Sequence, residues 1–332
     1  MRLSKEHIWP IIGLLAVLFS AWLLVHQLRN ISIDDILLSL DAIPLHRWIL
    51  AALATGVAYF ALAGYDRIAL LHLERDISWP YVAATSFTTY ALAHNIGASV
   101  ASGAVVRYRA YTAKGLTGTE VGILVGLCSF TFALGTILLG GIVILLQPDI
   151  LQLAFDEPAP WLPYAVSASL LSLVALYVLA SRLGLPAIRF KRFQLHYPAM
   201  PIVKKQLIIG PLELLGAAAI IYFALPAESN PGFLIVLGVF LASFSAALIS
   251  HAPGGLGVLE TLFLFALPEV NPADIIAALL VFRLFYLIIP FAISLIIIVL
   301  FERKQLLQYL SLKRFQKRNN EPQHKENNTH CE

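Results

Sequence analysis

Charged side chains stand inside or at the ends of long apolar stretches of this sequence, where a charge is costly and is usually paired or functional. Glu213, Glu260 and Arg283 lie within such stretches, and Arg107 and Arg109 close another. Guanidinium groups form planar forks that match phosphate oxygens, so we interpret the three arginines as phosphate-attracting groups. The two glutamates would balance this charge or take a cationic group. A purely structural pair between Arg283 and either glutamate is an equally open alternative.

A break in the apolar sequence supplies a second candidate feature. The stretch 250–260 contains Pro253, Gly254, Gly255 and Gly257. Proline removes an amide donor and glycine weakens a helix, and broken helix at membrane depth persists only when buried in protein or facing a wet cavity. A helical arm beginning near Gly254 would offer free N–H groups and a positive dipole end to an anion. A glycine-rich packing kink without a ligand is the alternative.

A similar break is predicted near His94, Asn95 and Gly97, and its flanking sequence echoes the one before His251. Both breaks interrupt segments of otherwise apolar character. His94 and His251 are candidates for proton transfer, although a histidine at a helix break more often donates a local hydrogen bond, which is the role we favour. The two breaks together suggest an inverted repeat with a site near the midplane, as in many secondary transporters.

The elements that position these residues follow from composition. Hydrophobic residues make up 59% of the 332 residues, charged residues only 13%, and the mean hydropathy is +0.79, which is typical of a polytopic helical membrane protein. Eight long apolar segments are present: 8–28, 48–71, 81–104, 118–146, 162–181, 206–226, 233–267 and 273–301. We therefore expect an all-α membrane domain over 1–301. A basic cytoplasmic tail, expected to be disordered, occupies 302–332.

Lysine and arginine in the connections predict the orientation. The connection after residue 181 and the tail after 301 are basic and are placed in the cytoplasm, whereas 147–161 and 227–232 are placed outside. Both termini are then cytoplasmic. The number of membrane crossings agrees with these sides if 81–104 and 233–267 are broken, re-entrant helical hairpins beside about six full spans. Three crossings in the last third of the chain would agree with them as well.

Sequence motifs of soluble enzymes are missing. The run Gly254 to Gly257 lacks the Lys-Ser/Thr of a nucleotide-binding phosphate loop and does not follow a strand. Two cysteines define neither a disulfide framework nor a metal site. We expect no cofactor, no metal ion and no nucleic-acid partner, and we favour a role other than catalysis.

Several of these motifs, in their order along the chain, resemble the transmembrane domain of the lysylphosphatidylglycerol synthase/flippase family (multiple peptide resistance factor). The matching pieces are Tyr65-Asp66, Asn95 with Gly97, Val106-Arg107-Tyr108-Arg109, Gly210-Pro211-Leu212-Glu213, the run Pro253 to Glu260, and Arg283 with Tyr286 and Pro290. In that family the membrane domain precedes a soluble aminoacyl-transferase domain and is implicated in moving modified lipid between leaflets. The resemblance implies a stand-alone member without the transferase, so the aminoacylation chemistry is not carried over.

The leading hypothesis is an integral protein of the bacterial inner membrane that binds and translocates a phospholipid or lipid-linked intermediate. The alternative is a membrane-embedded transferase or an accessory subunit of a lipid- or glycan-modifying enzyme. Expected partners are anionic membrane lipids and a separate biosynthetic transferase. Expected headgroup-binding residues are Arg107, Tyr108, Arg109, Glu213, Gly254, Gly255, Gly257, Glu260, Arg283 and Tyr286, supported by Tyr65, Asp66, His94, Asn95, Gly97, His251 and Pro253.

Overall fold

The structure, a computed structural model, describes residues 32–96, 99–153, 158–184, 188–190, 193–195, 198–250 and 253–300. It is all-α apart from one small two-stranded ribbon. The helices are α2 (Ile33–Asp41), α3 (Leu45–His72), α4 (Trp79–Ile96), α5 (Ser99–Thr112), α6 (Gly118–Leu146), α7 (Leu162–Arg182), α8 (Met200–Ala224), α9 (Phe233–Ser250), α10 (Val258–Ala266) and α11 (Pro272–Phe282). Short 3-10 turns cover Pro148–Leu153 and Pro253–Gly255, and a π-helical segment, η4, covers Arg283–Ile288.

Six helices within the described residues are long and apolar enough to cross a membrane. They are α3, α6, α7, α8, α9 and the continuous helix Pro272–Leu300, which contains α11 and η4. Five of them coincide with predicted full spans, because uninterrupted apolar sequence of about 20 residues is what a membrane-crossing helix requires. The sixth predicted span, 8–28, and the tail 302–332 lie outside the described residues. α9 was predicted instead as one arm of a hairpin.

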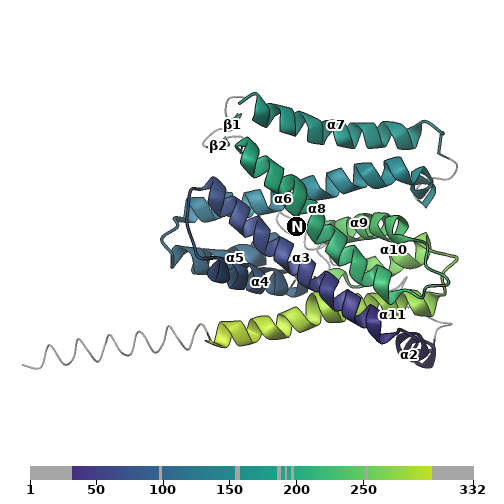
Figure 1. Ribbon diagram of the computed structural model, residues 1–332. Coiled ribbons are helices and arrows are strands. Elements are labelled where there is room, and N and C mark those ends of the chain that lie inside the picture. Colours follow the sequence, from purple (N-terminus) through teal and green to yellow (C-terminus); the bar gives the residue numbers. More distant parts are fainter. Residues whose placement is uncertain are drawn as a thin grey trace, which may run out of the picture.

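Two helix pairs replace continuous helices at the predicted breaks. α4 ends at Ile96 and α5 begins at Ser99, while α9 ends at Ser250 and α10 begins at Val258 after the turn Pro253–Gly255. The members of each pair pack against each other, as Figure 1 shows for α4 with α5 and for α9 with α10. The re-entrant insertion of these pairs from opposite sides of a membrane, and their inverted repeat, stay predictions.

The centre of the bundle is α8, which packs against α3, α6, α9 and α11 (Figure 1). Small residues allow these backbones to approach closely, as in other membrane helix pairs. A Cβ placed on Gly135 of α6 would lie 2.6 Å from the carbonyl carbon of Gly210 on α8, and a Cβ placed on Gly216 would lie 2.9 Å from the Ala54 carbonyl oxygen on α3. These crossings bring residue 213 into the middle of the bundle.

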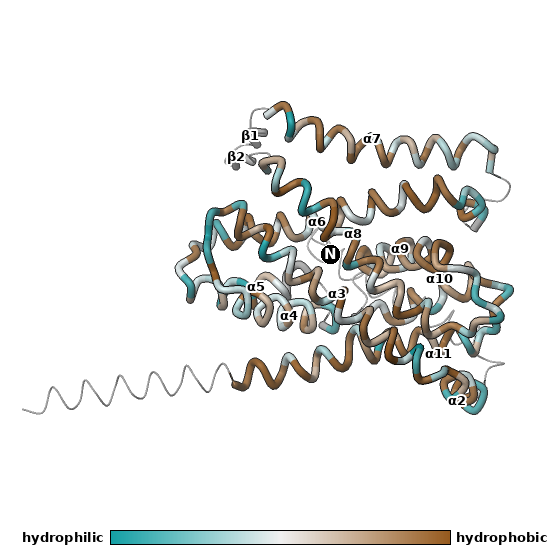
Figure 2. The backbone as a smooth tube through the Cα atoms, in the orientation of Figure 1, coloured by the Kyte–Doolittle hydropathy of each residue, from teal (hydrophilic) through white to brown (hydrophobic). Residues whose placement is uncertain are grey.

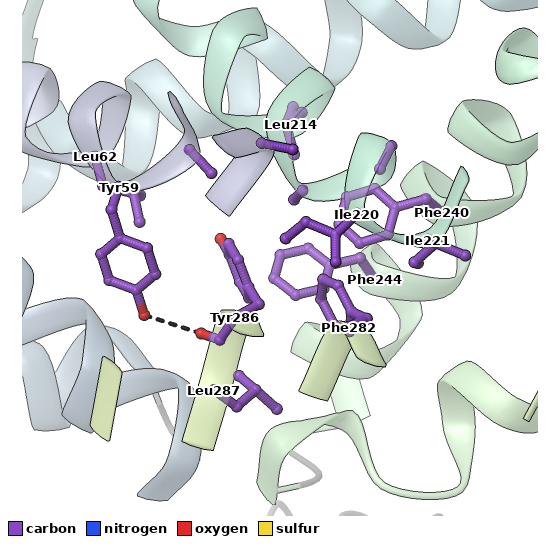
Figure 3. Close-up of a cluster of buried hydrophobic side chains, with 14 of the residues drawn as sticks. Tyr59, Leu62, Leu214, Ile220, Ile221, Phe240, Phe244, Phe282, Tyr286 and Leu287 are labelled. Atoms are coloured by element: carbon purple, nitrogen blue, oxygen red, sulfur yellow. Dashed lines mark hydrogen bonds between the residues drawn. The ribbon is translucent and has the colours of Figure 1, made fainter. Parts of the chain in front are cut away.

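An aromatic and aliphatic core surrounds α8 and the C-terminal helix. Tyr286 lies between Tyr59 of α3 and the Phe282–Phe244 group in Figure 3, and the Tyr59 hydroxyl donates to the Tyr286 carbonyl at 2.9 Å. By contrast α7 contacts mainly α6 and leaves many large apolar side chains exposed, among them Leu173, Leu176 and Leu179. Figure 2 shows this helix as mostly hydrophobic along its length, as expected of a helix that faces lipid.

Three local features were not anticipated from the sequence. The connection 29–47 contains α2, which begins with a capping box in which Ser32 and Asp35 satisfy each other's backbone donors. The basic connection after α7 contains strands β1 (Ile188–Phe190) and β2 (Phe193–Leu195), paired antiparallel. The last span contains the π-helical segment η4, and such segments are rare and often occur at functional sites.

Candidate functional site

The first buried cluster, the Asp66 cluster, consists of Asp66, Arg107, Tyr111 and Cys128. Arg107 Nη2 donates to Asp66 Oδ1 at 2.7 Å, and Arg107 Nε lies 3.2 and 3.3 Å from the two carboxylate oxygens. The Tyr111 hydroxyl donates to Oδ2 at 2.7 Å and the Cys128 thiol to Oδ1 at 3.4 Å. The Asp66 side chain is fully buried and that of Arg107 is 5% exposed. Each charge therefore has a hydrogen-bonded partner, as burial demands.

The second cluster, the Arg283 cluster, joins the π-helical segment to the glycine-rich break. Arg283 donates through Nε to Glu260 Oε1 at 2.9 Å, through Nη2 to the same oxygen, and through Nη1 to the Gly254 carbonyl at 2.8 Å. Both side chains of the ion pair are about nine-tenths buried. The structure thereby selects Glu260, rather than Glu213, as the partner of Arg283.

The start of α10 uses its glycines and its glutamate together. Gly254 and Gly257 have φ values of 59° and 80°, a region that residues with a Cβ rarely adopt. The Gly257 N–H donates to Glu260 Oε2 at 2.9 Å, so the glutamate side chain already satisfies one of the free donors at this helix start. Gly255 is buried with φ 65°, and a Cβ there would meet side chains of Leu259 and Ala247. The break is thus a tightly packed turn at Gly255.

The third cluster, the Glu213 cluster, consists of Glu213 with Tyr65 and Tyr286. The Tyr286 hydroxyl donates to Glu213 Oε1 at 2.5 Å, and the Tyr65 hydroxyl lies 3.4 Å from Oε2 and 3.1 Å from the Gly210 carbonyl oxygen. All three side chains are buried. This carboxyl group differs from Asp66 and Glu260, because its partners are tyrosine hydroxyls rather than a guanidinium.

The end of α4 connects the three clusters. His94 stacks on the Tyr286 ring with centroids 5.2 Å apart, and its Nδ1 is buried without a hydrogen-bond partner. Tyr90, one turn earlier, carries the Arg107 guanidinium 4.7 Å above its ring. Asn95 donates to the Leu287 carbonyl of η4 at 3.2 Å, a bond that links the α4 break to the C-terminal helix.

The two predicted breaks lie against each other in the bundle. A Cβ placed on Gly254 would lie 3.5 Å from Arg283 Nη1 and 4.0 Å from the His94 carbonyl oxygen. The end of α4 therefore meets the turn Pro253–Gly255 beside η4, as the sequence pattern suggested for a shared site. Buried charge, broken backbone and a π-helical segment come together at this place, which we take as the candidate site.

Most of the predicted site residues lie in or next to these clusters. Tyr65, Asp66, His94, Asn95, Arg107, Glu213, Gly254, Gly257, Glu260, Arg283 and Tyr286 take part in the contacts above, and Gly255 and Pro253 form the turn. Tyr108 and Arg109 are exposed on α5, beside the cluster residue Arg107 in the sequence. Gly97 and His251 lie outside the described residues.

Four contributors were missed by the sequence reasoning. Tyr111 and Cys128 complete the partners of Asp66, Tyr90 lies under Arg107, and Tyr59 holds the Tyr286 carbonyl. Tyr111 lies four residues after Arg107, on the same face of a helix, and this spacing was the available signal for it. Cys128 sits in an unbroken apolar run, where nothing in its neighbourhood distinguishes it from a core residue.

Comparison with known protein families gives one match that covers most of the chain. The model of the family described as "Lysylphosphatidylglycerol synthase TM region" matches residues 13–294. All the cluster residues lie within this range. The match agrees with the resemblance stated from the sequence motifs.

Three curated relatives illustrate the range of similar proteins. The chain is 28% identical over 268 residues to the "Uncharacterized protein slr0712" of Synechocystis, covering 80% of this chain and 82% of that one. It is 31% identical over 255 residues to the "Inner membrane protein YbhN" of Escherichia coli, covering 74% and 77%. It is 27% identical over 292 residues to the "Phosphatidylglycerol lysyltransferase" of Staphylococcus haemolyticus, covering 85% of this chain but only 33% of that protein.

Proposed function

Because this chain belongs to the lysylphosphatidylglycerol synthase transmembrane-region family, we propose that it binds a phospholipid or lipid-linked intermediate and moves it between the leaflets of a bacterial inner membrane. A relative is named as an inner membrane protein, and others are named as phosphatidylglycerol lysyltransferases. An anionic phospholipid headgroup is accordingly the ligand class that we propose. The chain spans about a third of the length of the lysyltransferases, so their transferase activity forms no part of the proposal.

One observation carries this proposal. Four charged residues from four different elements are buried in a bundle whose helices can cross a membrane, and the side chain of a fifth, Arg283, is about nine-tenths buried. The two broken helix pairs meet beside them. Intramembrane charge and broken backbone are both expensive, and proteins retain them mainly along substrate or ion pathways. A headgroup entering this region would exchange its hydration for the Arg283 guanidinium and for the Gly257 N–H, both of which now donate to Glu260.

The ion pair between Arg283 and Glu260 would keep the proposed lipid pathway closed when no lipid is bound. Arg283 donates to Glu260 and to the Gly254 carbonyl, which fixes the start of α10 against the C-terminal helix. An anionic headgroup that took over part of this guanidinium would release Glu260 and the turn before α10. Competition of this kind would open the region only when lipid is present and would reseal it afterwards.

Lipid translocation in reconstituted liposomes tests the proposal. Purified protein is inserted into vesicles carrying fluorescent phosphatidylglycerol, and a membrane-impermeant quencher reports which leaflet holds the label. We expect faster exchange than in protein-free vesicles, and slower exchange for Arg283→Lys, because an ammonium keeps the charge but not the fork. Arg75→Lys is the matched control, since Arg75 pairs with Glu120 at a partly exposed position.

Two outcomes would count against translocation. Exchange at the protein-free rate by a folded wild-type protein would refute the proposal for this lipid class. A chemically altered lipid, found by mass spectrometry without any change of leaflet, would favour the membrane-embedded transferase instead. Mass spectrometry of lipid that co-purifies with the protein would identify the headgroup.

A further inference from the structure

The carboxyl group of Glu213 is buried at the centre of the bundle, and no cationic side chain of the described residues pairs with it. Within the described residues Arg107 pairs with Asp66 and Arg283 pairs with Glu260, and no Lys, Arg or His lies within ion-pair distance of Glu213. An unpaired ionised carboxylate in such surroundings is costly, so burial favours the neutral, protonated form of Glu213. In Asp66 and Glu260 the paired guanidinium favours the ionised form instead.

The hydroxyl of Tyr65 has two acceptors and one hydrogen. Its oxygen lies 3.1 Å from the Gly210 carbonyl oxygen and 3.4 Å from Glu213 Oε2. A carbonyl only accepts, whereas a carboxyl group accepts when ionised and donates when protonated. With a proton on Glu213, the carboxyl donates to Tyr65 and Tyr65 donates to Gly210. Without it, Tyr65 turns its hydrogen to the carboxylate. The geometry accommodates both states through one hydroxyl rotation.

We propose that Glu213 is a proton-binding site whose loading and release, with Tyr65 switching between the Gly210 carbonyl and the carboxylate, couples the movement of lipid to the movement of protons. This inference rests on the proposed function for its transport step. The proton is taken from water on one side and returned to water on the other, so no oxidant, nucleotide or further reactant is needed.

The groups around Glu213 fit this role. Tyr59 and Tyr65 face it from α3 and Tyr286 faces it from η4, while α9 contains no titratable residue. Cys128 of α6 and Asp66 of α3 bond to each other in the Asp66 cluster. His94 of α4, near Arg107, stacks on a face of the Tyr286 ring and keeps an unpartnered buried Nδ1. A second protonatable group therefore lies one ring away from the carboxyl group, at the α4 break.

Infrared difference spectroscopy of the purified protein, between acidic and alkaline buffer, tests proton binding without transport. We expect a carbonyl-stretching band of a protonated carboxyl group that Glu213→Gln abolishes and that Glu260→Gln retains. Tyr65→Phe should keep the band but shift it, because the acid loses its acceptor. If folded wild type shows no band that depends on residue 213, the proton site is overturned. If the band in Tyr65→Phe is not shifted, the switch is overturned.

An imposed pH gradient across the liposomes tests the coupling. With one proton moved per lipid, a gradient of about one pH unit should bias the leaflet distribution about tenfold. Tyr65→Phe, which retains the carboxyl group, should reduce this bias. Lipid exchange that ignores the gradient would overturn the coupling and leave the proposed function standing. No exchange under any condition would overturn the proposed function and the coupling, whereas the infrared band would still report the proton site.

Discussion

Removal of Arg107 should destabilise the protein more than removal of any exposed arginine. Among the residues that the structure describes, Arg107→Leu leaves the fully buried Asp66 carboxylate with Tyr111 and Cys128 as its remaining side-chain donors. Breaking a buried pair in this way costs ~3–5 kcal/mol, and the lost contact between the guanidinium and the Tyr90 ring adds to it. We therefore expect a loss at the upper end, about 4–5 kcal/mol.

A second substitution separates the charge from the packing. Asp66→Asn in the Arg107→Leu background removes the uncompensated charge while the amide oxygen can still accept from Tyr111. The double variant should then recover roughly 2–3 kcal/mol, and the remaining deficit of about 2 kcal/mol corresponds to the lost cation–π contact with Tyr90 and the lost guanidinium hydrogen bonds.

Equilibrium unfolding in mixed detergent micelles, followed by circular dichroism as the denaturing detergent increases, gives these free energies. Arg182→Leu is the control, because it changes the same residue type at an exposed position on α7 and should cost no more than about 0.5 kcal/mol. Equal stability of the Arg107 and Arg182 variants would refute the buried pair. Additive single losses in the double variant would refute the coupling between Asp66 and Arg107.

Three further predictions concern the break, its arginine and the orientation. Gly254→Ala should lower the free energy of unfolding by ~1–2 kcal/mol in the same assay, because the φ of residue 254 is 59°. The control Gly140→Ala, inside α6, should be neutral or stabilising, and equal effects of the two variants would contradict a strained turn. Arg283→Lys should remain folded, and the rise in melting temperature on adding anionic phospholipid should shrink; an unchanged rise would remove Arg283 from the lipid site. In intact cells a membrane-impermeant thiol reagent should label Glu228→Cys but not Arg182→Cys, and the reverse pattern would overturn the orientation.

The position of the spans and of the two breaks was predictable because it depends on local properties of the chain. Apolar runs long enough to cross a membrane gave α3, α6, α7, α8 and the C-terminal helix. Pro253 and the glycines after it mark the turn before α10, since they weaken a helix wherever it packs. The π-helical segment and the β1–β2 ribbon had no such local signal.

The presence of buried, partnered charge was also indicated by sequence, because a charge inside an apolar run needs a partner in any fold. Asp66, Arg107, Glu213, Glu260 and Arg283 were all identified in this way, and all are buried or nearly so. The sequence thus determined which residues require partners. It left open whether Arg283 pairs with Glu260 or Glu213.

Only the tertiary structure decided the partners. Asp66 and Arg107 are 41 residues apart, and Arg283 and Glu260 are 23 apart, so each contact depends on which helix faces meet. The close crossing of α8 with α3 and α6, set by small residues such as Gly216 and Gly135, turns Glu213 toward tyrosines instead of arginines. Helix rotation and packing distance depend on contacts between helices that are distant in the sequence, so the local properties of the sequence do not determine them.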